Sequence, residues 1–106
     1  MNSPLRITLR DLEPSTAIEG SVRAHAQKLE RLCPKLTSCH VTIDSPHRHK
    51  RHGRRFRVRI ELGVPGDTLV VAGDPGDEDA YAAVNAAFHH AERQLADAHR
   101  TGRERA

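Results

Sequence analysis

The segment from Ser45 to Ile60, SPHRHKRHGRRFRVRI, concentrates the residue types that bind metals or polyanions. It holds seven of the seventeen lysines and arginines and three of the eight histidines, and it contains no acidic residue. Imidazoles are common zinc ligands, whereas arginine and lysine neutralise repeating phosphates. The composition of this segment therefore allows two interpretations, a metal site or a surface for an anionic partner.

The spacing HxHxxH in this segment is formed by His47, His49 and His52. Zinc needs three or four neutral imidazoles, thiolates or carboxylates around it. Here the histidines are interleaved with Arg48, Lys50 and Arg51, whose charges repel a dication, and the segment offers no acid or cysteine as a fourth ligand. The pattern favours an anion-binding loop, and a metal-dependent or metal-storing protein stays as an alternative.

The rest of the sequence gives little support for enzymatic chemistry. It contains no glycine-flanked nucleophile elbow and no glycine-rich phosphate-binding loop. The acidic run Asp77–Asp79 precedes a helical pattern, where capping and the helix dipole account for it. We therefore expect no catalytic residue, no cofactor and no small-molecule substrate.

Charge is distributed unevenly along the chain. The formal net charge is +3, but Ser45–Ile60 carries +7, so the remaining ten basic and fourteen acidic residues sum to −4. Such polarisation predicts one face for an anionic partner. No apolar run approaches the ~20 residues that span a bilayer, and no signal-peptide core is present. We expect a cytoplasmic protein with no membrane partner.

Apolar periodicity predicts the elements that position these charges. Residues 5–10 alternate between apolar and polar, as in a half-buried strand. A helix is predicted from about Ser15 to Cys33, introduced by the capping box Thr16-Ala17-Ile18-Glu19 and ended by Pro34. Cys33 and Cys39 both lie on apolar faces, so we expect buried thiols in preference to a redox pair.

Three strands and a second helix follow. Strands are predicted at 39–44, 55–64 and about 68–72, with a turn at Val64-Pro65-Gly66-Asp67 between the last two. The segment between the first two of these strands has no apolar period, which predicts an exposed loop. A helix is predicted from about residue 80 to residue 98, followed by a polar tail at 101–106.

The order β-α-β-β-β-α predicts an α+β fold, a two-layer sandwich with both helices on one face of a four-stranded sheet. We expect one domain at 1–100 and the tail at 101–106. The other sheet face is polar and can stay in water. It carries Arg6, Thr8, Arg10, Thr42, Arg57 and Arg59.

Basic residues on the two helices extend the predicted polyanion surface beyond the loop. The RNA-binding candidates are Arg23, Lys28, Arg31, Lys35, His47, Arg48, His49, Lys50, Arg51, Arg54, Arg55, Arg93 and Arg100. The chain has only three aromatic residues, Phe56, Tyr81 and Phe88, which suit core or helix-docking positions. Because stacking on single strands needs exposed aromatics, structured RNA or a duplex is the expected target.

Three segments resemble the ribosome hibernation promoting factor (protein Y) family. They are QKLERL at 27–32, FRVRIELGVPGDTLVV at 56–71 and DAYAAVNAAFHHAERQL at 79–95. The resemblance extends from about Leu5 to Arg100. It implies a non-enzymatic factor that binds the small ribosomal subunit in the messenger and transfer RNA channel near the decoding centre, and that silences ribosomes under stress.

Carried over by position, Lys28, Arg31 and Arg93 match basic family positions that face 16S ribosomal RNA. Long members continue into a second domain that dimerises ribosomes, whereas this chain stops at Ala106, so we expect no ribosome dimerisation from this chain alone. Relatives with a similar histidine-rich loop continue into a cold-shock-like domain, so a short form and a fragment are both open. A generic double-stranded RNA-binding domain stays as the alternative function.

Overall fold

The computed structural model describes residues 4–45, 55–72 and 79–105, with 99–105 described as helix backbone. The elements in chain order are β1 (Leu5–Arg10), α1 (Thr16–Leu32), β2 (Ser38–Asp44), β3 (Arg57–Val64), β4 (Asp67–Ala72) and α2 (Ala80–Arg105). This order confirms the predicted β-α-β-β-β-α fold of the α+β class. Because α2 continues to Arg105, its backbone enters the segment expected to be a polar tail. The division into a domain and a tail stays a prediction.

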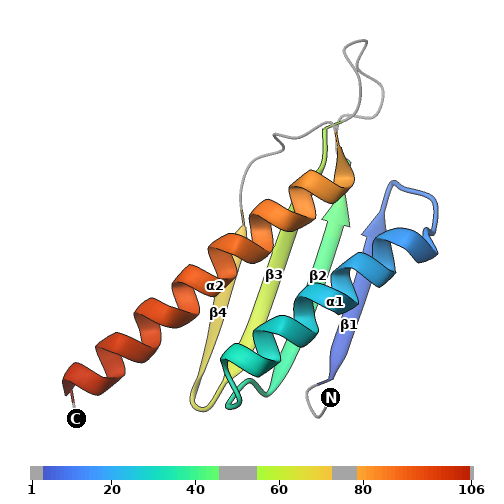
Figure 1. The fold of residues 1–106 in the computed structure, drawn as a ribbon. Coiled ribbons are helices and arrows are strands. Elements are labelled where there is room, and N and C mark those ends of the chain that lie inside the picture. The colour runs from blue at the N-terminus through green and yellow to red at the C-terminus, as the bar shows by residue number, and fades with distance from the viewer. Residues whose placement is uncertain (1–3, 46–54, 73–78, 106) are drawn as a thin grey trace.

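The four strands form one mixed sheet in the order β1-β2-β3-β4. β1 is parallel to β2, and the other two pairs are antiparallel. Pro65 and Gly66 make the hairpin turn between β3 and β4, and Gly66 has a φ of 77°, which glycine adopts at low cost. Both helices lie on one face of the sheet and run in the same direction. α1 lies on the side of the sheet nearer β1, and α2 lies over β3 and β4 (Figure 1).

The core lies between the sheet and the helices. Alternate residues of β2 and β3 point into it, and each helix contributes one apolar stripe, as the periodicity predicts. Phe88 of α2 is the largest fully buried side chain, and Ala83, Ala87 and Ala91 of the same helix are also buried. These alanines let α2 approach its neighbours closely. Phe56 is half-buried and packs against this core.

The N-cap of α1 lies one residue before the predicted position. Ser15, not Thr16, is the N-cap, with extended backbone angles, and its Oγ accepts a hydrogen bond from the Ile18 N–H at 3.2 Å. A hydroxyl at either position can cap, and the backbone conformation decides which one does. At α2 the Asp79 carboxylate accepts from the Tyr81 N–H at 2.9 Å, as expected of that acidic run. Asp77 and Glu78 lie outside the described residues.

Both cysteines are free, and Cys39 on β2 is the more buried of the two. Burial raises the pKa of the Cys39 thiol from 9.0 to about 11, because desolvation disfavours the thiolate. Cys39 is therefore an unreactive core thiol at neutral pH, as expected from its place on an apolar face.

The Cys39 thiol should make the folded state less stable in alkali. Between about pH 9 and pH 11 the unfolded chain loses this proton while the folded chain keeps it, so the free energy of unfolding falls as pH rises. The loss should reach roughly 2–3 kcal/mol near pH 11. Urea denaturation from pH 8 to 11 measures it. Cys39→Ala should flatten the decline relative to wild type, and Cys33→Ala should not; equal slopes in all three proteins would contradict this assignment.

Candidate nucleic-acid interface

The open face of the sheet is polar, as predicted, and its side chains largely pair with one another. In the register of the strands, Thr8 of β1 lies beside Thr42 of β2. The hydroxyls of both threonines lie within hydrogen-bonding distance of His40 Nε2, at 3.0 Å from Thr8 and 3.5 Å from Thr42. These contacts join the edge strand β1 to β2 on this face.

Two of the arginines on this face are held by carboxylates. Arg57 on β3 lies opposite Asp44 on β2 and donates two hydrogen bonds to it, at 3.1 and 2.8 Å. Arg59 donates to Glu61, two residues further along β3, at 3.1 Å. A phosphate that approached either arginine would meet the neighbouring carboxylate as well. The positive charge of this face is therefore largely compensated at β3.

Arg6 and Arg10, on the edge strand β1, are exposed and make no ion pair within the described residues. Both lie on the polar sheet face that the sequence predicts, but neither was among the predicted RNA-binding residues. Nothing in the sequence distinguished them from ordinary surface charge, because they lie on a strand and not on the basic helices.

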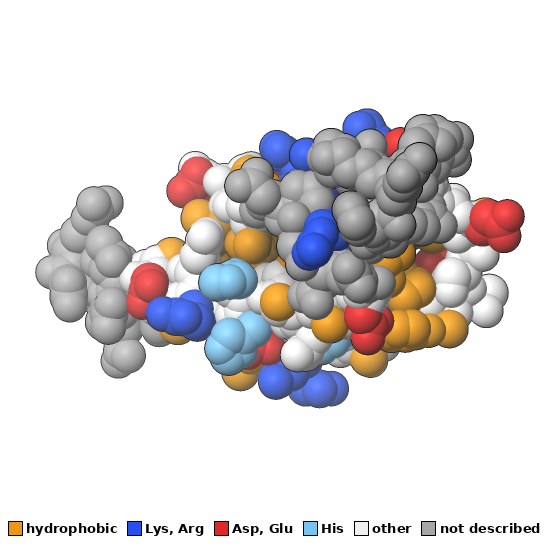
Figure 2. Space-filling model, turned by 90° about the horizontal axis from the view of Figure 1, so that it is seen from above, with side chains coloured by type: hydrophobic (Ala, Val, Ile, Leu, Met, Phe, Trp, Pro, Cys, Tyr) orange, Lys and Arg blue, Asp and Glu red, His pale blue; other side chains and the backbone are white. Residues whose placement is uncertain are grey.

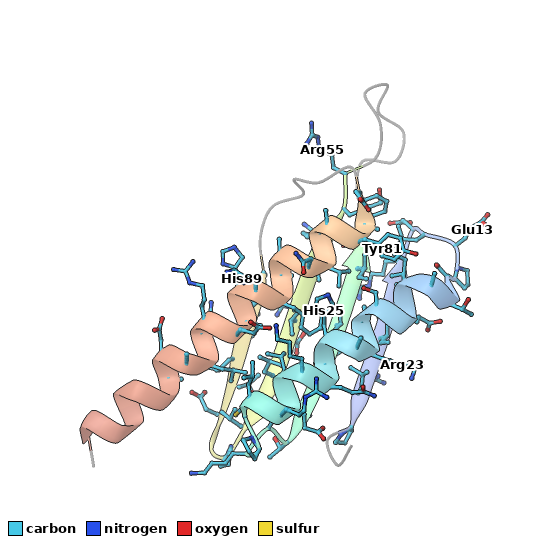
Figure 3. The ribbon with its side chains drawn as sticks, viewed as in Figure 1. Glu13, Arg23, His25, Arg55, Tyr81 and His89 are labelled. Atoms are coloured by element: carbon cyan, nitrogen blue, oxygen red, sulfur yellow. The ribbon has the colours of Figure 1, made fainter. Side chains whose placement is uncertain are left out.

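The basic residues of α1 spread around its exposed surface. With 3.6 residues per turn, Arg31 projects roughly opposite the buried stripe, and Lys28 lies on the flank facing α2. Arg23 lies on the flank nearer β1 (Figure 3). The flank of Arg23 also carries two acids of the same helix, Glu19 and Glu30, which weaken its local potential. Arg31 is the more favourable candidate, since it is exposed and makes no ion pair within the described residues.

Two contacts join α1 to α2. The His25 ring stacks on the buried Phe88 ring, with centroids 5.0 Å apart and planes 12° from parallel. One helical turn further along, Lys28 Nζ lies 3.4 Å from Glu92 Oε1. These contacts set residues 28 and 92 at the same level of the molecule, so the C-terminal half of α1 lies beside the middle of α2.

On α2, Arg93 is exposed, and His89 extends outward from the helix (Figure 3). The side chain of Arg100 is not among those described, although its backbone is helical. Tyr81 was expected at a core or helix-docking position. It is instead 47% exposed at the start of α2. Figure 2 shows basic side chains and histidines side by side along the molecule, with hydrophobic side chains between them.

The predicted basic residues divide between opposite ends of the fold. Lys28, Arg31 and Lys35 lie at the end where α1 finishes and β2 starts, whereas Arg55, which is exposed, precedes β3 at the other end. The seven residues of β2 span about 20 Å between these ends. The remaining candidates precede Arg55 in the sequence, and they lie outside the described residues. They are His47, Arg48, His49, Lys50, Arg51 and Arg54.

The metal alternative is not decided by this arrangement. His47, His49 and His52 all lie outside the part of the chain that the structure describes. Within the described residues no three His, Cys, Asp or Glu side chains gather closely enough to hold a metal ion. Nor is any described helix long and apolar enough to cross a membrane.

The fold and its charges define a small α+β protein with an exposed basic helix layer. The model of the family described as sigma 54 modulation protein / S30EA ribosomal protein matches residues 5–102. The chain therefore belongs to this family, which confirms the resemblance seen in its sequence. A search of the curated proteins found no match.

Two solved structures share the fold. A ribosomal subunit interface protein from Coxiella burnetii superposes with a TM-score of 0.74 at 16% sequence identity, covering 89% of this chain and 94% of that one. The N-terminal domain of protein Y from Thermus thermophilus gives a TM-score of 0.68 at 28% identity, covering 90% of this chain and 96% of that one. The first of these likenesses concerns the fold alone, because its identity is low.

Removing two arginines from the helices should weaken heparin binding more than removing two arginines from the sheet face, where the arginines are paired with carboxylates. Arg31→Gln with Arg93→Gln should weaken binding to heparin and lower the salt dependence by roughly two charges, because both guanidinium groups are exposed and make no ion pair within the described residues. Arg57→Gln with Arg59→Gln removes the same charge from the paired sheet face and serves as the matched control. Elution from a heparin column in a salt gradient compares them. A sheet-face pair that elutes as early as the helix pair would contradict this assignment.

Proposed function

We propose that this protein binds the small ribosomal subunit in the channel for messenger and transfer RNA, near the decoding centre, and silences ribosomes under stress. Its family membership supports a ribosomal partner, and the names of both structural neighbours refer to a ribosomal interface protein or to protein Y. The protein acts by occlusion, without catalysis or a cofactor. It works in the cytoplasm.

One structural observation carries this proposal: both helices carry exposed cations that make no ion pair within the described residues. Arg31 and Lys35 come from α1 and the segment after it, and Arg93 comes from α2. Such a surface neutralises phosphates of 16S ribosomal RNA from two elements at once. Counterion release then supplies much of the affinity.

The same surface favours folded RNA over single strands. Stacking on unpaired bases needs several exposed aromatic side chains, and within the described residues Tyr81 alone is an exposed aromatic. Contacts to phosphates and to the shape of the target therefore provide recognition. The basic segment 46–54, which the sequence predicts to be a loop, is a proposed second contact.

Binding to ribosomes should be strong at low salt and should weaken steeply as salt rises. Six to ten phosphate contacts lose roughly 10³–10⁵ in affinity between 50 and 200 mM salt. Co-sedimentation of the protein with small subunits across this range measures the effect, and inhibition of translation in a cell-free system should follow the same curve. Retention at high salt, or no association at any salt, would count against the proposal. Displacement by free duplex RNA would favour a generic double-stranded RNA binder instead.

Charge reversal on the helix layer should abolish association with the subunit. Arg31→Glu with Arg93→Glu changes the local charge by four units without touching the buried stripes, so the fold should persist by circular dichroism. Arg31→Lys with Arg93→Lys keeps the charge and should retain most of the binding. If the glutamate variant still co-sediments like wild type, these helices do not contact the RNA.

A further inference from the structure

Glu92 of α2 forms an ion pair with a basic residue of the other helix, Lys28 of α1. Its side chain is 22% exposed, whereas that of Lys28 is 57% exposed, and the two charged groups lie 3.4 Å apart. The Glu92 carboxylate is therefore the more buried partner of this pair, and the Lys28 ammonium is the more exposed one. Glu92 was not among the residues predicted from the sequence, because only its neighbour Arg93 matched a basic position of the family.

The carboxylate of Glu92 occupies the place that a phosphate oxygen would take beside Lys28. An ion pair this exposed contributes little to stability, so a phosphate can replace Glu92 as the partner of Lys28. Once that exchange occurs, Glu92 is a fixed, unpaired negative charge beside the bound phosphate. Each contact of RNA with Lys28 thus carries an opposing interaction that a bare basic surface would lack.

The helix interface does not depend on this ion pair. The stacking of His25 on Phe88 also joins the helices, and the apolar stripe of each helix is buried in the core. Removing the charge of Glu92 should therefore leave the fold intact. This separates an effect on RNA recognition from an effect on folding.

We propose that Glu92 is a specificity-determining residue that lowers affinity for RNA in general more than for the proper target. A strand that touches Lys28 alone gains little over the existing ion pair and is repelled by Glu92. A compactly folded RNA that engages Arg31 and Arg93 in the same encounter overcomes this repulsion through the additional contacts. Discrimination by a deliberately unfavourable contact is a common route to specificity. The inference rests on the proposed function, since it refers to the same helix surface.

The test compares Glu92→Gln with Glu61→Gln, a matched control on the opposite face. Glu61 also forms an ion pair with a basic residue, Arg59, at 3.1 Å, and its loss changes the net charge equally. Affinities for a generic RNA duplex and for small ribosomal subunits are measured at one salt concentration. Glu92→Gln should bind the duplex roughly two- to fivefold more tightly than Glu61→Gln does. Its affinity for the subunit should rise less, so the ratio of the two affinities falls.

Further variants separate charge from geometry. Glu92→Asp keeps the charge and should keep weak duplex binding. In a Lys28→Gln background the gain from Glu92→Gln should shrink, because the released lysine is absent. Equal duplex affinity for Glu92→Gln and Glu61→Gln, or weaker binding by Glu92→Gln, would overturn the inference. If wild type fails to bind subunits, the proposed function fails, while the duplex comparison still decides whether Glu92 opposes RNA binding.

Discussion

Both helices bury one stripe on the same face of a four-stranded sheet, and this constraint positions the charges of the helix layer. Each helix then has one flank facing the other, one flank facing outward and a ridge that projects into solvent. The stacking of His25 on Phe88 joins the two helices. Residues far apart in the sequence, such as Lys28 and Glu92, consequently meet between them.

The arginines of the sheet face and those of the helix layer differ in whether an acidic side chain lies beside them. On the sheet, neighbouring strands place Asp44 opposite Arg57, and a two-residue spacing places Glu61 on the same face as Arg59. Cross-strand pairs of opposite charge stabilise a sheet, and they also cancel its field. On the helices, outward positions such as Arg31 have no such neighbour at the required spacing. A basic surface therefore develops on the helix layer although the sheet also carries several arginines.

The sequence was sufficient to predict the element order and the two-layer fold, because the first three strands and both helices have a clear apolar period and a turn signal introduces the fourth strand. The predicted N-cap of α1 was wrong by one residue, since Ser15 and Thr16 both have hydroxyls and only the backbone angles distinguish them. Tyr81 was expected at a core or docking position, but it is exposed at the first turn of α2.

The candidate site was harder to predict than the fold. Periodicity correctly indicates that Lys28 and Arg31 lie off the buried stripe of α1. It does not determine how α1 and α2 are rotated relative to each other, and that rotation decides that Lys28 meets Glu92. It also does not show that the arginines of β3 are paired, because this depends on strand register.

A protein that silences ribosomes by occlusion has no chemical step to improve its selectivity, so selectivity must come from binding alone. Phosphates attract a basic surface whatever the sequence of the RNA, and other cellular RNA competes with the target. The useful quantity is then the ratio of target to non-specific affinity rather than either value. Adding cations raises both affinities, whereas one fixed carboxylate among them selectively penalises partners that make few contacts. On this reasoning the weak pair between Lys28 and Glu92 contributes little to stability, and its value lies in recognition.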